Sequence, residues 1–120
     1  MKTILIPFDF SANARKALAY ALELGKLFES QLYIYQVLHE SPYTLAAAAT
    51  EQEMEKLIAK DGEEKTAALK DEVNTLLQSL PITFSAERIK TKAEYNPLVV
   101  EKIIAVAKEQ DAELVIMGTH

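Results

Sequence analysis

The strongest constraint on the fold is an alternation between segments typical of strands and segments with helical periodicity. Strand-forming residues gather at positions 4–8, 32–38, 82–92 and 114–117, and apolar residues recur at helical spacing over 14–28, 51–80 and 99–107. The first and last strand segments are continuously apolar, and the second is dense in β-branched and aromatic residues. These patterns indicate strands covered on both faces, as in a parallel sheet. Strands that alternate with helices in this way predict an α/β fold, an open parallel sheet with helices on both faces.

The third strand is predicted to lie at an edge of the sheet. Apolar and polar residues alternate from position 82, the pattern of a half-exposed strand. Arg88, Lys90 and Lys92 continue the alternation with positive charge, which discourages pairing between sheet edges. These three side chains are expected at the carboxyl end of the strand. They could attract a phosphate, but a solvated edge is the favoured interpretation.

Several residues predict where helices begin, pack and break. Ser11 is a good N-cap for the first helix. Asn96 and Pro97 predict an N-cap followed by proline in the first helical position of the third helix. Gly25 indicates close packing of the first helix against the sheet. Gly62, among polar neighbours, predicts a kink or a break in the long second helix.

Charge and composition exclude several classes of protein. The 120 residues include 18 acidic and 13 basic side chains, a net charge of -5, which opposes binding to nucleic acid or to anionic membrane surfaces. The absence of cysteine excludes disulfides and cysteine-ligated zinc. Asp9 ends the N-terminal apolar run too early for a signal peptide or a membrane span. We expect a soluble, cytoplasmic protein with a single domain over residues 1–120.

Candidate ligand-binding residues follow from the expected sheet, because open parallel sheets bind ligands beyond the carboxyl ends of their strands. Asp9 follows the first strand and could accept a hydrogen bond from a ribose or contact a metal indirectly. It could equally stabilise the amino terminus of the next helix. His39 ends the second strand and His120 ends the sequence, but their spacing does not predict a metal site.

Known catalytic patterns are absent from the sequence. Ser11 lacks the glycines of a nucleophile elbow, and no phosphate-binding loop of the P-loop type is present. A phosphorelay receiver domain would need further acids beside Asp9, and an adenylate-forming enzyme of the pyrophosphatase type would need a Ser-Gly-Gly run after the first strand. The sequence therefore favours a binding module over an enzyme.

The two ends of the sequence resemble the universal stress protein family. Residues 4–11, with Ala14 and Ala17 behind them, resemble the opening of such a domain, and residues 114–120 resemble its fourth strand with a Met-Gly-Thr-His signature. Residues 32–39 fit the second strand of the family. The resemblance implies a Rossmann-like fold of the adenine nucleotide alpha hydrolase type, with five parallel strands in the order 3-2-1-4-5.

The resemblance also implies an ATP site, with Mg²⁺ accompanying the nucleotide. In nucleotide-binding members the residue matching Asp9 contacts the nucleotide, and backbone near Val37 and Leu38 meets the adenine. A phosphate loop of pattern G-x2-G-x9-G-[ST] would begin at Gly118. The implied nucleotide-binding residues are Pro7, Asp9, Val37, Leu38, Met117, Gly118, Thr119 and His120.

The sequence departs from this pattern because it ends two residues after Gly118. The later glycines of the loop, the fourth helix and the fifth strand are missing, so we expect a domain that is incomplete at its C-terminus, with the order 3-2-1-4. The exposed fourth strand would be covered by a second copy or by another chain segment. Two functions stay open. The first is an ATP-binding module in stress response, with slow ATPase activity at most. The second is a dimerising protein-interaction module that binds no nucleotide.

Overall fold

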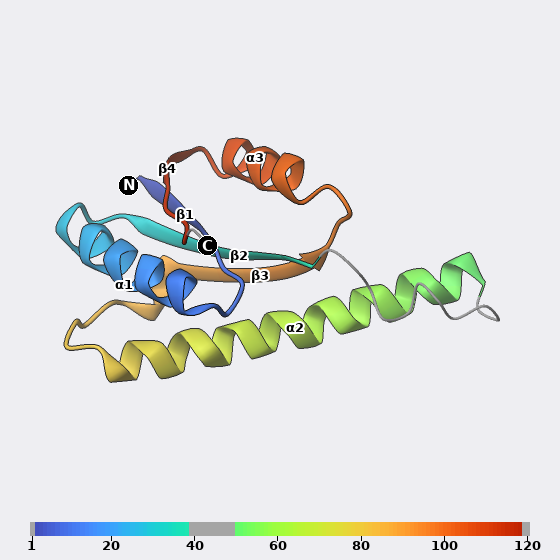
Figure 1. Ribbon diagram of the computed structural model, residues 1–120, viewed down its shortest axis with the longest axis horizontal. Coiled ribbons are helices and arrows are strands. Elements are labelled where there is room, and N and C mark those ends of the chain that lie inside the picture. The colour runs from blue at the N-terminus through green and yellow to red at the C-terminus, as the bar shows by residue number, and fades with distance from the viewer. Residues whose placement is uncertain (1, 39–49, 119–120) are drawn as a thin grey trace.

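The computed structural model describes residues 2–38 and 50–118, and its core is a parallel sheet flanked by helices (Figure 1). The elements are β1 (Thr3–Pro7), α1 (Ala12–Leu27), β2 (Gln31–Leu38), α2 (Glu51–Ser79), a short 3-10 helix (Ala86–Arg88), β3 (Ile89–Tyr95), α3 (Val99–Glu109) and β4 (Ala112–Val115). The strands run parallel in the order β3-β2-β1-β4. The expected α/β class and the order 3-2-1-4 are therefore confirmed.

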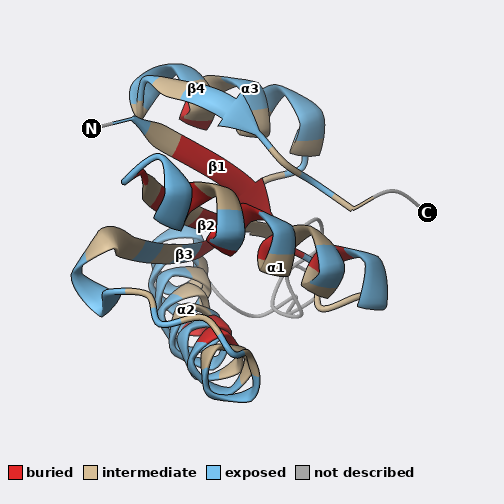
Figure 2. Ribbon diagram, turned by 90° about the vertical axis from the view of Figure 1, so that its left-hand side faces the viewer, coloured by how far each residue is buried: buried red, intermediate tan, exposed pale blue. Residues whose placement is uncertain are grey.

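The helices form layers on both faces of the sheet. In Figure 1, α1 and α2 lie below the sheet and α3 lies above it. Because side chains alternate along a strand, Ile4 and Ile6 of β1 join the core between the sheet and helices α1 and α2, whereas Leu5 joins a smaller core with Val106 of α3. Both faces of β1 are covered, as its continuous apolar run predicts. Figure 2 shows this strand as the buried centre of the sheet.

The helices begin where the sequence provides caps, and α2 does not break. The Ser11 hydroxyl accepts the Ala14 N–H (3.0 Å), so the predicted cap of α1 is confirmed. Thr50 and Glu53 form a reciprocal capping box that starts α2. The prediction of a break at Gly62 is wrong, because α2 continues through this position as one 29-residue helix.

Gly25 packs closely against the sheet, as predicted. A methyl group in its place would lie 3.0 Å from a terminal methyl of Leu32 and 3.1 Å from the ring of Phe84. Phe28, expected on the apolar face of the same helix, is instead 63% exposed. It lies beyond the end of α1, where the chain leaves the helix for β2.

The third strand begins later than the sequence predicts, at Ile89 rather than at residue 82. Arg88 explains the difference. Its guanidinium donates to the carbonyls of Ser30 (2.7 and 3.0 Å) and Gly25 (2.7 Å) and lies 4.7 Å from the ring centre of Phe84. These contacts hold Arg88 at the amino end of β3, so its expected place at the carboxyl end is wrong.

The predicted edge position of the third strand is confirmed. Lys90 and Lys92 lie within β3 and are exposed, rather than at its carboxyl end. The third helix begins at Val99, with Leu98 as its N-cap residue. Asn96, the predicted N-cap, instead accepts the Leu98 N–H through its side chain (2.9 Å) in the turn before the helix.

The expectation that the fourth strand is buried is wrong. Leu114 and Val115 of β4 are 44% and 41% exposed. β4 pairs with β1 along one edge, and among the described residues no strand pairs with its other edge. The apolar side chains of β4 are therefore exposed, because β4 has one neighbouring strand among the described residues.

Within residues 2–38 and 50–118, no helix combines the length and the apolar character that a membrane span requires.

Candidate functional site

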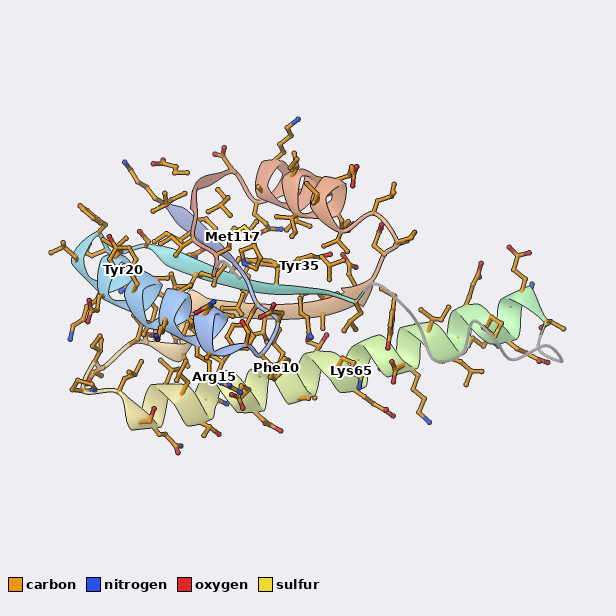
Figure 3. All side chains as sticks on the ribbon, in the orientation of Figure 1. Phe10, Arg15, Tyr20, Tyr35, Lys65 and Met117 are labelled. Carbon is orange, nitrogen blue, oxygen red and sulfur yellow. The ribbon has the colours of Figure 1, made fainter. Side chains whose placement is uncertain are left out.

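A cavity opens at the carboxyl edge of the sheet, where β1 and β2 end. Its lining comes from the end of β1, the start of α1, β2, α3 and the segment after β4, namely Pro7, Phe8, Asp9, Ala14, Tyr35, Val37, Val99, Ile103, Met117 and Gly118. The labelled side chains of Tyr35 and Met117 lie between α3 and the sheet in Figure 3. The cavity holds about 160 Å³, less than the about 300–1,000 Å³ of complete ligand sites. The described residues therefore form a cavity smaller than a complete ligand site.

Five of the residues selected from the sequence line this one cavity. They are Pro7, Asp9, Val37, Met117 and Gly118. Leu38 is not among the lining residues, and its carbonyl accepts the Asn96 N–H (3.0 Å) at the end of β3. Thr119 and His120 lie outside the described residues, as does His39.

Asp9 is exposed at the mouth of the cavity and also supports the turn into α1. Its Oδ1 accepts the Ser11 N–H at 3.0 Å. Phe10, between these two residues, has φ 65°, a left-handed conformation that costs a bulky residue about 1–2 kcal/mol. The ring of Phe8 lies 5.2 Å from that of Phe10 in an edge-on arrangement, which helps to hold the turn. The carboxylate thus stabilises the turn while it lines the cavity.

Gly118 is required by the close approach of two backbone segments. A Cβ atom at this position would lie 2.5 Å from the carbonyl carbon of Asn13 and 2.7 Å from the nitrogen of Ala14. The segment after β4 therefore lies directly against the first turn of α1. Only glycine fits here, and its backbone is at the amino end of a helix, where N–H groups favour anions.

Comparison with known proteins places this fold in a family. The sequence profile described as "Universal stress protein family" matches residues 1–120. The chain belongs to the universal stress protein family. Its identity is 30% over 118 residues to the universal stress protein Sll1654 of Synechocystis sp., and 26% over 119 residues to the universal stress protein MJ0531 of Methanocaldococcus jannaschii. In both comparisons 98% of this chain is matched, and it spans 66% and 64% of the lengths of these relatives.

Solved structures of the universal stress protein family share the fold. The chain superposes on the universal stress protein UspA from Lactobacillus plantarum with a TM-score of 0.67 at 20% identity, over 99% of this chain and 79% of that one. A universal stress protein in complex with cAMP gives a TM-score of 0.62 at 20% identity, over 96% of this chain and 74% of that one. At these identities the likeness establishes the fold.

One wall of the cavity in this universal stress protein was missed by the sequence analysis. Tyr35 is 1% exposed, it lines the cavity, and its hydroxyl donates to Glu94 on β3. Lys102 of α3 lies 3.4 Å from the same carboxylate. Burial, and then the hydrogen bond to Glu94, raise the pKa of Tyr35 well above its usual value. Alternation along β2 was the available signal, since Tyr35 and Val37 must share a face.

The chemical character of the lining fits part of an adenine nucleotide. Apolar side chains such as Val37, Ile103 and Met117 fit a base, and the Asp9 carboxylate fits ribose hydroxyls. Among the described lining residues, Asp9 alone is charged, so phosphates would depend on backbone N–H groups near Gly118. Within the described ranges no three carboxylate or histidine side chains gather in a way that could hold a metal ion.

Proposed function

We propose that this member of the universal stress protein family is an adenine-nucleotide-binding module that acts in stress response in the cytoplasm, with ATP and Mg²⁺ as its ligand. The observation that carries the proposal is the cavity itself. Five residues selected from the sequence, far apart along the chain, line one cavity at the sheet edge where parallel folds bind ligands. The cAMP bound by a structural neighbour with the same fold also supports an adenine nucleotide as ligand.

The described lining residues would contact different parts of the nucleotide. The adenine would lie among Pro7, Val37 and Met117, and the ribose hydroxyls would donate to Asp9. The phosphates would extend towards Gly118 and the amino end of α1. Asp9 is the only carboxylate among the described lining residues, and it is already engaged with the Ser11 N–H. This arrangement favours binding of ATP over rapid hydrolysis, with slow ATPase activity at most.

Calorimetric titration of Mg·ATP into the 120-residue chain tests the proposal. We expect saturable binding that weakens at least about tenfold in Asp9→Ala, because a charge-assisted hydrogen bond is lost. Asp9→Asn keeps an oxygen for the Ser11 N–H and separates the ligand contact from the structural one. Asp71→Ala, an exposed change on α2, is the matched control. Absence of saturable binding of both ATP and cAMP to the unmodified chain would contradict the proposal.

A second function, a protein-interaction module, is favoured by a separate observation. An apolar groove runs between α3 and β4, with Val100, Ile104, Val115 and Met117 on its sides. All four are at least 41% exposed. A patch of this kind, next to a strand edge with which no described strand pairs, is typical of an interaction surface. The occupant would be a second copy of the chain or another chain segment.

Molar mass measured by light scattering during size exclusion tests this second function. A dimerising module would show a mass that rises with concentration, and Val115→Lys would return it to the monomer. Lys70→Met, an exposed change on α2, should leave the mass unchanged. A monomer at every concentration would contradict self-association through this groove.

A further inference from the structure

We propose that Glu94 and Lys102 are positioning residues for the nucleotide cavity, which hold Tyr35 and the first half of α3 in the places where they form its inner wall. The inference rests on the proposed function and deepens it. It concerns two residues that do not line the cavity themselves. They act through neighbours that do.

The contacts form a continuous chain from β2 through β3 to α3. The Tyr35 hydroxyl donates to Oε1 of Glu94, and the Lys102 ammonium lies 3.4 Å from the same oxygen. One carboxylate thus joins the tyrosine ring on one strand to a helix packed over the sheet. The pair Lys102–Glu94 ties α3 to β3, an outer strand of the sheet.

Partial burial makes this pair different from an ordinary surface ion pair. The side chains of Lys102 and Glu94 are 27% and 35% exposed, whereas those of the pair Lys2–Glu113 are 66% and 54% exposed. Shielded charges are screened less by solvent and salt. The hydroxyl of Tyr35 also needs a partner, because an unpaired polar group in a buried position is costly. Glu94 supplies it.

The position of Lys102 explains why the pair would matter for binding. Val99 and Ile103, three residues before and one residue after Lys102, both line the cavity from α3. Tyr35 lines it from the sheet. The carboxylate of Glu94 therefore fixes two walls of the cavity relative to each other. A wall held in place before the ligand arrives reduces the ordering that binding requires.

Calorimetry with Mg·ATP on the full 120-residue chain tests the inference through graded variants. Lys102→Met and Tyr35→Phe should each weaken binding by about 5- to 10-fold, whereas Lys102→Arg should retain it because the ion pair is preserved. The double variant Tyr35→Phe with Lys102→Met should bind about as weakly as either single variant, since both changes disable the same link. Lys108→Met, at the other end of α3 and exposed, should bind ATP like the unmodified chain.

The outcomes separate this inference from the function on which it rests. Unmodified chain that fails to bind ATP overturns both. If the unmodified chain binds ATP and both Lys102→Met and Tyr35→Phe bind it equally well, the positioning role alone is overturned. Loss of affinity in Lys102→Arg would overturn it as well. Thermal unfolding of each variant shows whether it is folded at the titration temperature. Tyr35→Phe keeps the ring in the core and serves as the test if Lys102→Met does not fold.

Discussion

The two outer strands of the sheet, β3 and β4, occupy equivalent positions but are protected in different ways. β3 has a charged sequence, yet Ala93 at its centre is 1% exposed and α2 lies along it. β4 has an apolar sequence, yet it is drawn largely as exposed in Figure 2. Both strands pair with a single neighbour among the described elements. Position in the sheet therefore does not determine burial, which depends on what covers the strand.

The protection of β3 comes from side chains of α2. The N–H of Ala93 donates to the Thr66 hydroxyl (2.9 Å), which also lies 2.8 Å from the Gly62 carbonyl. Near the end of the strand, the Tyr95 hydroxyl donates to the buried Asp61. A helix can thus supply hydrogen-bond partners to the backbone of an edge strand that has no further strand beside it. No such helix lies along the free edge of β4 in the part of the chain that the structure describes.

The largest effect is expected from a comparison of two leucines, Leu69 in α2 and Leu114 in β4. Leu69→Ala removes a fully buried side chain that anchors α2 over the sheet, and it should lower the free energy of unfolding by about 2–5 kcal/mol. Leu114→Ala on β4 makes the same change at a residue that is 44% exposed, and it should cost less than about 1 kcal/mol. Urea denaturation measures both. Equal losses would show that β4 is buried in solution, by a second copy or otherwise.

Alanine substitutions at two glycines should change the free energy of unfolding in opposite directions, by less than Leu69→Ala does. Gly118→Ala forces a methyl group against the backbone of Asn13 and should destabilise the fold by about 1–3 kcal/mol, as overpacking does. Gly62→Ala, where the nearest atom to the new methyl group is the Ala93 carbonyl at 3.7 Å, should stabilise the helix by about 0.5–1 kcal/mol. Thermal unfolding gives both signs. Stabilisation by Gly118→Ala would contradict the close approach after β4.

The sequence predicted the fold well because its signals were local and agreed with one another. Continuous apolar strands, a serine cap and regular alternation led to the α/β class, whereas the strand order, which the structure confirms, was implied by the family resemblance. The errors lie where tertiary contacts override a local pattern. Residues 82–87 alternate like a strand, but the contacts of Arg88 with Ser30 and Gly25 turn the chain before β3 begins. The apolar sequence of β4 predicted burial, which requires a neighbour that no local pattern can reveal.

The candidate site was predicted in part, from position in the sheet and from resemblance together. Asp9, Val37 and Gly118 stand at expected strand ends, the resemblance implied a nucleotide contact for each, and the structure brings all three to one cavity. The role of these residues in nucleotide binding stays a prediction. The link from Tyr35 to Glu94 could not be predicted, because it joins residues 59 positions apart in the sequence whose proximity depends on the register of β2 and β3. That register becomes visible only in the folded sheet.

A further expected effect concerns the Thr66 hydroxyl of α2, which bonds to the edge of β3. Thr66→Val keeps the shape of the side chain but leaves the Ala93 N–H without its acceptor, and it should lower the free energy of unfolding by about 1–2 kcal/mol. Thr75→Val is the matched control, because the exposed Thr75 hydroxyl donates to the Asp71 carbonyl within α2 itself (3.0 Å). Its cost should be within about 0.5 kcal/mol. Hydrogen exchange would also report faster exchange of the Ala93 amide in Thr66→Val alone. Unchanged exchange would mean that α2 shields β3 by packing rather than by this hydrogen bond, and that the two outer strands differ only in apolar cover.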